Sequence, residues 1–68
     1  MNLFQVSGTF NARPIKTKIF KDSNKALKYL DRVLVDCNVE INDVINVEDT
    51  LTTYVVNNYT RFTVAKLD

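Results

Sequence analysis

Side chains suited to acid–base, nucleophilic or metal chemistry are scarce in this 68-residue sequence. It has no histidine, which removes the commonest general base and the commonest transition-metal ligand. Its single cysteine, Cys37, falls on the apolar face of a predicted helix, where a thiol behaves as a small hydrophobic residue. A single glycine excludes a glycine-rich phosphate-binding loop. We therefore expect a protein that is not an enzyme and that has no catalytic residue, no metal and no cofactor.

Four acidic residues, Glu40, Asp43, Glu48 and Asp49, lie close together in the sequence. They lack the spacing and the central glycine of a 12-residue calcium loop. We interpret them as a solvated acidic loop; the alternative is a contact site for a basic surface of a partner.

Binding chemistry is better represented than catalysis. Tyrosine and arginine are enriched among the residues that dominate binding energy at protein interfaces. The strand pattern described below predicts that several such residues, together with two lysines and a valine, share a sheet face that no helix covers. The predicted binding residues are Lys16, Lys18, Tyr54, Val56, Tyr59 and Arg61. The alternative for Tyr54 and Arg61 is a simple cross-strand pair.

One stretch, residues 22–37, has a clear helical period. Its apolar residues recur at steps of three and four positions and therefore share one face; they are Ala26, Leu27, Leu30, Val33, Leu34 and Cys37. Asp22 or Ser23 is suited to cap the start, and Asn38 to adopt the left-handed conformation that ends a helix. A short amphipathic helix must pack on something, and the other apolar runs of the chain are typical of strands.

The residues before the helix predict a hairpin. Residues 3–10 alternate between apolar and polar, as a half-buried strand does, and Gly8 on the apolar side indicates a bend or the close approach of another backbone. Residues 11–14 favour a turn. In residues 15–20 the alternation predicts that Ile15, Thr17 and Ile19 face one way, with Phe20 folding over the start of the helix.

A second hairpin is predicted after the helix. Val44–Val47 is a short β-branched segment; we favour a break at Glu48-Asp49 over a bulge in one long strand, because adjacent acids are poorly tolerated inside a sheet. Residues 50–56 and 59–67 then form strands joined by a two-residue turn at Asn57-Asn58. That turn sets Tyr54 opposite Arg61, and it assigns four residues to the helix-covered face: Leu51, Val55, Phe62 and Val64.

These elements predict a single α+β domain over residues 1–68. It has one antiparallel sheet of four or five strands, in the order hairpin, helix, hairpin, with one α-helix packed on one face.

Composition narrows the class of protein further. Nine basic and eight acidic residues give a net charge of +1, which does not favour generic attraction to nucleic acid or an anionic membrane. The lone cysteine fits a reducing compartment, the first residues do not form a signal peptide, and no apolar run reaches the roughly 20 residues that a membrane span requires. We expect a cytoplasmic protein that does not associate with a membrane.

The run IKTKIFKDSNKALKYLDRVL, a strand followed by an Asp-Ser cap and a helix with an early Ala-Leu, sits among short strands. In this layout the chain resembles the small early proteins of bacteriophages, including several anti-CRISPR proteins and phage inhibitors of host enzymes. The resemblance covers architecture across the chain and carries over no site residue. It implies a non-enzymatic protein-binding module that inhibits or modulates a bacterial host protein by steric occlusion, in the host cytoplasm. The alternatives are a nucleic-acid-binding protein that uses the open sheet face and a homodimer formed through that face.

Overall fold

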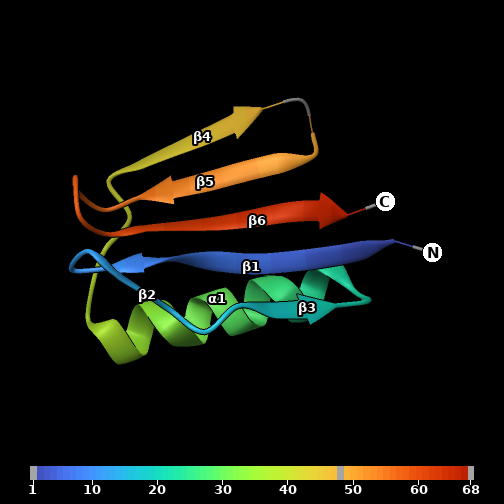
Figure 1. Ribbon diagram of the computed structural model, residues 1–68, viewed down its shortest axis with the longest axis horizontal. Coiled ribbons are helices and arrows are strands. Elements are labelled where there is room, and N and C mark those ends of the chain that lie inside the picture. Colours follow the sequence, from blue (N-terminus) through green and yellow to red (C-terminus); the bar gives the residue numbers. More distant parts are fainter. Residues whose placement is uncertain (1, 48, 68) are drawn as a thin grey trace.

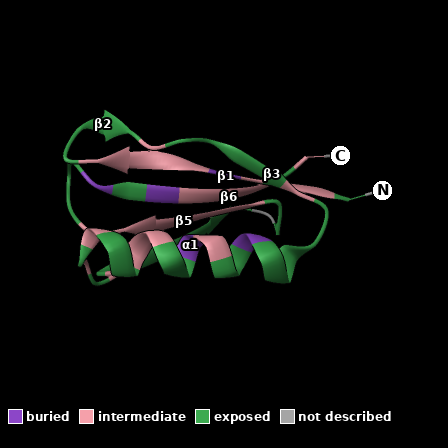
Figure 2. Cartoon of the chain, turned by 90° about the horizontal axis from the view of Figure 1, so that it is seen from below, coloured by how far each residue is buried: buried purple, intermediate pink, exposed green. Residues whose placement is uncertain are grey.

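The computed structural model describes residues 2–47 and 49–67. Within them the chain forms six strands and one helix: β1 (Leu3–Phe10), β2 (Arg13–Pro14), β3 (Lys18–Phe20), α1 (Ser23–Cys37), β4 (Asp43–Val47), β5 (Leu51–Val55) and β6 (Arg61–Leu67). The strands form a single antiparallel sheet, and the helix lies on one of its faces (Figures 1 and 2). The predicted α+β class is therefore confirmed.

The first and last long strands are neighbours at the centre of the sheet. The strand order is β2-β1-β6-β5-β4, and β3 also pairs with β1, on the same edge as β2 (Figure 1). Thr9 pairs with Pro14, and Val6 pairs with Lys18. Between these two pairs there are three residue steps along β1 but four along the edge strand opposite it. The extra residue interrupts this edge strand between β2 and β3, as a bulge does.

The helix begins and ends as its sequence predicts. The side chain of Asp22 accepts a hydrogen bond from the backbone N–H of Asn24 at 2.8 Å, which caps the first turn. Asn38 adopts the left-handed conformation (φ 55°, ψ 49°), and its N–H is directed to the carbonyl groups of Leu34 and Val35.

The core lies between the helix and the middle of the sheet. Val6, Ala26, Leu30 and Phe62 are buried together there (Figure 2). At the edge, Phe20 packs on Tyr29 with ring centroids 5.5 Å apart, which closes the core beside β3. The helix packs closely on β1, β3 and β6, whereas β4 and β5 extend beyond it (Figure 1).

Gly8 lies where two backbones approach each other, as one of the two sequence interpretations states. Its strand partner is Phe62. A Cβ atom at position 8 would collide with the carbonyl oxygen of Arg61 and would stand 2.8 Å from the Cα of Phe62. Only glycine lets β1 and β6 meet at this distance.

The predicted break after β4 is confirmed. β4 ends at Val47 and β5 begins at Leu51, so two strands are present. Asp49 has a positive φ of 48°, as turn residues often do; the other residue of the predicted break, Glu48, lies outside the described residues.

The predicted two-residue turn at Asn57-Asn58 is wrong. The N–H of Val56 donates to the carbonyl of Thr60 at 3.0 Å, so the loop contains three residues, 57–59. The N–H of Tyr59 donates to Oδ1 of Asn57 at 2.8 Å, which stabilises the longer loop. One added loop residue shifts the register by one, and a shift of one exchanges the faces of a strand relative to its neighbour.

The face assignment of β5 is consequently wrong as well. Tyr54 pairs with Phe62, and Tyr54 and Val56 pack against the core from the helix side. Leu51 and Val55 pair with Ala65 and Arg61 on the opposite face.

Ile15 and Ile19 do not share a face, contrary to the sequence prediction. The bulge between β2 and β3 separates them: Ile15 packs against the core, and its N–H donates to the carbonyl of Gly8 at 3.0 Å. Ile19 pairs with Gln5 on the face away from the helix and is 57% exposed.

Candidate functional site

The six residues predicted to bind a partner do not lie on one surface. Tyr54 and Val56 pack against the core on the helix side, and Tyr59 projects from the loop between β5 and β6 with 66% of its surface exposed. Arg61 lies in β6 and is exposed between Thr9 and Val55, on the face that the helix leaves open. Of the six, Arg61 is the one that a strand register places on the open face.

The two predicted lysines lie near Tyr29 of the helix. Lys18 pairs with Val6, so its side chain starts on the helix side, and its Nζ lies 4.9 Å from the centroid of the Tyr29 ring. That distance is typical of a cation–π contact. The hydroxyl of Tyr29 donates to the carbonyl of Lys16 at 3.1 Å. The observed contacts of these two residues therefore help to dock the β2–β3 edge on the helix.

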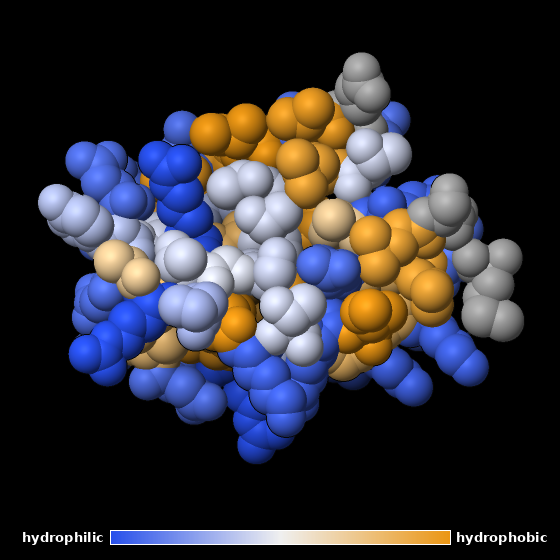
Figure 3. Space-filling model, viewed as in Figure 1, coloured by the Kyte–Doolittle hydropathy of each residue, from blue (hydrophilic) through white to orange (hydrophobic). Residues whose placement is uncertain are grey.

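The strand registers place a different set of side chains on the open face. Because alternate residues of a strand point to opposite faces, the partners of Gln5, Ser7 and Thr9 share their face. Apolar residues are the largest group in this set: Leu3, Ile19, Ile45, Val47, Leu51, Val55, Ala65 and Leu67. Figure 3 shows this face, with apolar surface gathered over β4 and β5 and near the chain ends, and a paler strip between them. We call this surface the open face.

One row of the open face carries three neutral hydroxyl side chains beside Ile45. Ser7, Thr63, Thr53 and Ile45 form one row across β1, β6, β5 and β4. The hydroxyls of Thr53 and Thr63 lie 3.3 Å apart and form a hydrogen bond, so they partly satisfy each other without water. Hydroxyls that are already paired are less costly to cover than free ones.

The charged strand residues of the open face lie at one of its ends. Among the strand residues that the registers place there, Asp43 and Arg61 carry charge, and they lie in one row with Val55 between them. The outer surface of the helix differs, because Lys25, Lys28, Asp31, Arg32 and Asp36 are all exposed there. The open face is thus much poorer in charge than the opposite side of the molecule.

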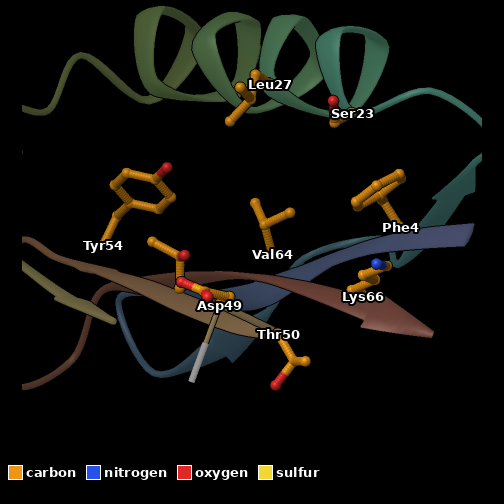
Figure 4. A pocket seen from close by; sticks show the side chains of 9 residues that line it. Phe4, Ser23, Leu27, Asp49, Thr50, Tyr54, Val64 and Lys66 are labelled. Atoms are coloured by element: carbon orange, nitrogen blue, oxygen red, sulfur yellow. The ribbon is translucent and has the colours of Figure 1, made fainter. Parts of the chain in front are cut away.

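The side of β5 that faces the helix carries a shallow groove of about 200 Å³. Figure 4 shows Leu27 reaching from the helix toward Val64 and Tyr54, with Phe4 at one end of the groove. Lys66 and Asp49 are the charged residues among those that line it. Its walls offer apolar contact and no pair of groups arranged for proton transfer.

No three Cys, Asp or Glu side chains among residues 2–47 and 49–67 lie close enough together to hold a metal ion. Cys37 is half-buried on the helix and is not in a disulfide. In the same ranges, the chain has no helix of sufficient length and apolar character to cross a membrane.

Sequence reasoning predicted an open sheet face but assigned Leu51 and Val55 to the helix side, because it reversed the two faces of β5. The signal that could have revealed it is the second apolar set of the C-terminal half: Ile45, Val47, Leu51, Val55, Ala65 and Leu67. Comparison with known proteins adds no further assignment: no family model, no curated protein and no solved structure matches this chain.

Proposed function

We propose that this chain is a protein-binding module that binds its partner through the open face. The observation that carries the proposal is the largely apolar character of that face and its small number of charged residues, on a sheet whose other face packs against the helix over β1, β3 and β6. A one-sided antiparallel sheet usually presents polar residues to water. Exposed apolar patches, such as the one over β4 and β5, mark interaction sites.

The size of the open face suits a specific but modest interface. Five strand positions at about 4.8 Å and about six residues at 3.3 Å give a projected area of roughly 500 Å². An occupied face would then bury about 1,000 Å² over both partners, near the lower bound of specific protein–protein interfaces. The expected partner therefore presents a flat, largely apolar surface of similar size.

A protein partner fits the open face better than a nucleic acid does. Binding to nucleic acid depends on cations that contact phosphates and on aromatic rings that stack on bases. Arg61 is the cation on this face, with Asp43 in the same row, while Lys18 contacts the helix and Tyr54 packs against the core. Titration of labelled single-stranded DNA and RNA at low salt should show no binding at tens of micromolar protein; saturable binding would instead support the nucleic-acid alternative.

A bacterial host protein is the class of partner to test first, because of the resemblance to small phage inhibitors. The mechanism would be steric: a rigid sheet face covers a functional surface of the host protein. Catalytic groups are not needed for this activity, which is consistent with the scarcity of such groups in the sequence.

Two matched substitutions test the proposed function. Ala65→Lys puts a charge at the middle of the open face, and Val35→Lys puts the same charge on the outer side of the helix, where Val35 is 77% exposed. In pull-downs from a bacterial lysate, the proteins retained by the wild type should also be retained by Val35→Lys and lost with Ala65→Lys. Equal retention by both variants would exclude the open face as the binding surface.

A further inference from the structure

Strand β4 forms an unprotected edge of the sheet. It pairs with β5 on one side, and no strand among residues 2–47 and 49–67 pairs with its other side (Figure 1). All five of its residues are exposed, and the sequence DVINV contains no lysine, proline or glycine. Natural proteins usually block such edges with lysine, proline or a bulge, because free backbone groups pair readily with another strand.

The opposite edge is blocked in several of these ways. There the edge strand is interrupted between β2 and β3, carries Pro14, and has Lys18 at the start of β3. A strand added to this sheet would therefore pair with β4.

The hydrogen bonds of β5 show which groups of β4 point outward. Val56 N–H bonds to Thr60 and the carbonyl of Thr50 accepts from Lys66, so the even-numbered residues of this segment direct their backbone groups to β6. The backbone N–H and C=O groups of Leu51, Thr53 and Val55 consequently point toward β4. Those of their partners Val47, Ile45 and Asp43 point back toward β5. The outward backbone groups of β4 are therefore those of Val44 and Asn46.

These two residues are not equally free to accept a new strand. The N–H of Val44 already donates to Oδ1 of Asp43 at 2.9 Å. The hydroxyl of Thr52 donates to the side-chain Oδ1 of Asn46 at 2.7 Å. The backbone N–H and carbonyl of Asn46 point outward, away from β5. The exposed edge thus offers one residue with both a donor and an acceptor in a fixed position.

We propose that a second copy of this chain pairs with β4 in an antiparallel manner, about a two-fold axis at Asn46. The Asn46 N–H of each copy donates to the Asn46 carbonyl of the other. On the open face this register sets Ile45 of each copy beside Val47 of the other, in the close non-hydrogen-bonded positions of an antiparallel pair. Ile45 and Val47 are 47% and 48% exposed in the single chain, so both would gain burial.

The neighbouring register, with the two-fold axis at Ile45, is less favourable. It places the Asp43 carboxylate of one copy beside Val47 of the other, which removes water from a charge without providing a partner for it. It also requires the Val44 N–H, which Asp43 already holds. A second copy fits the edge better than an unrelated strand does, because the central donor and acceptor and the Ile45–Val47 contacts are self-complementary under a two-fold axis.

The dimer would place two open faces side by side on one larger sheet. The dimer goes beyond the proposed function and does not depend on it. Sedimentation velocity from about ten micromolar to one millimolar should show the wild type passing from monomer to dimer. Asn46→Pro removes the central donor, and because that N–H points outward no hydrogen bond within the chain is lost. We expect this variant to dimerise at least tenfold more weakly, while Asn46→Ala, which keeps the N–H, dimerises like the wild type.

Two further measurements make the test decisive. Ala65→Lys should still dimerise; loss of the dimer in Ala65→Lys but not in Asn46→Pro would show that the open face forms the contact, and would overturn the proposal. If circular dichroism shows that Asn46→Pro is unfolded, the amide exchange of Asn46 in the wild type provides the readout. Exchange that slows as the concentration rises supports the proposal, whereas concentration-independent exchange, or a wild type that stays monomeric at one millimolar, excludes it.

Discussion

Tyr54 and Phe62 face each other across β5 and β6, on the side of the sheet that the helix covers. Phe62 is fully buried, and Tyr54 covers the end of the core where the helix stops short of β5. This pair determines which side chains of β5 face the helix and which remain on the open face. The identity of the candidate binding surface therefore depends on it.

Substitution of Tyr54 tests that register. Tyr54→Ala should lower the free energy of unfolding by about 2 kcal/mol, because it removes aromatic contact with the core. Thr53→Ala, one residue away and on the open face, should lower it by about 1 kcal/mol at most, through loss of the hydrogen bond to Thr63. Urea unfolding followed by circular dichroism compares the two, and a larger loss in Thr53→Ala would show that the faces of β5 are reversed.

Leu30 lies at the centre of the core and is 3% exposed. Leu30→Ala should cost about 2–5 kcal/mol, as truncation of a buried leucine does. The core of a domain of this size contributes about 3–5 kcal/mol to the free energy of unfolding, so the variant should be largely unfolded at 37 °C. Lys28→Ala, on the outer side of the helix, provides the control; thermal melts within one or two degrees of each other would mean that the helix is not docked as described.

Gly8 allows the close contact of β1 with β6. Gly8→Ala should destabilise the fold by at least about 2 kcal/mol, because the two central strands must separate to admit the Cβ atom. Ser7→Ala is the matched control, since its side chain lies on the open face. Equal melting temperatures for these variants would contradict the tight β1–β6 contact.

Thr60 connects the β5–β6 loop to the β1–β2 turn at one end of the sheet. It is 1% exposed, and its hydroxyl accepts the N–H of Asn11 at 3.0 Å. Thr60→Val keeps the shape of the side chain but leaves that N–H without its acceptor, which should cost about 1 kcal/mol. The amide of Asn11 should also exchange faster with solvent in the variant, and unchanged exchange would show that this hydrogen bond does not hold the loop.

The helix and the α+β class could be predicted from sequence because their signals are local. Apolar spacing fixes the face of a helix, and Asp22 and Asn38 mark its ends through their own backbone chemistry. Residues 3–10 likewise alternate strongly enough to identify β1 and to indicate the special role of Gly8.

The register of β5 could not be predicted because both of its faces are apolar. Leu51 and Val55 lie on one face of β5, and Tyr54 and Val56 lie on the other. Either apolar pair could share a face with Phe62 and Val64 of β6, so the pattern fits both registers. The choice depends on a single residue of loop length, which the side chain of Asn57 helps to set. Ile19 was misplaced for a similar reason, because a one-residue bulge leaves no mark in the alternation.

These two shifts account for the difference between the predicted and the observed open face. They moved Tyr54, Val56 and Lys18 onto the open face in the sequence analysis, and they moved Leu51, Val55 and Ile19 away from it. Arg61 and the polar side of β1 were assigned correctly, because the alternation of residues 3–10 and the core-side positions of Phe62 and Val64 do not depend on either shift.

Site-specific photo-crosslinking tests the central claim, that the open face binds a protein, most directly. A photoreactive amino acid at Thr63 lies at the middle of the open face, and one at Arg32 lies on the outer side of the helix. In bacterial cells that produce the protein, Thr63 should form one discrete covalent adduct, and purified partner should bind the wild type at least tenfold more tightly than Ala65→Lys. Adducts from Arg32 alone, the same adducts from both positions, or none from Thr63 would contradict the account.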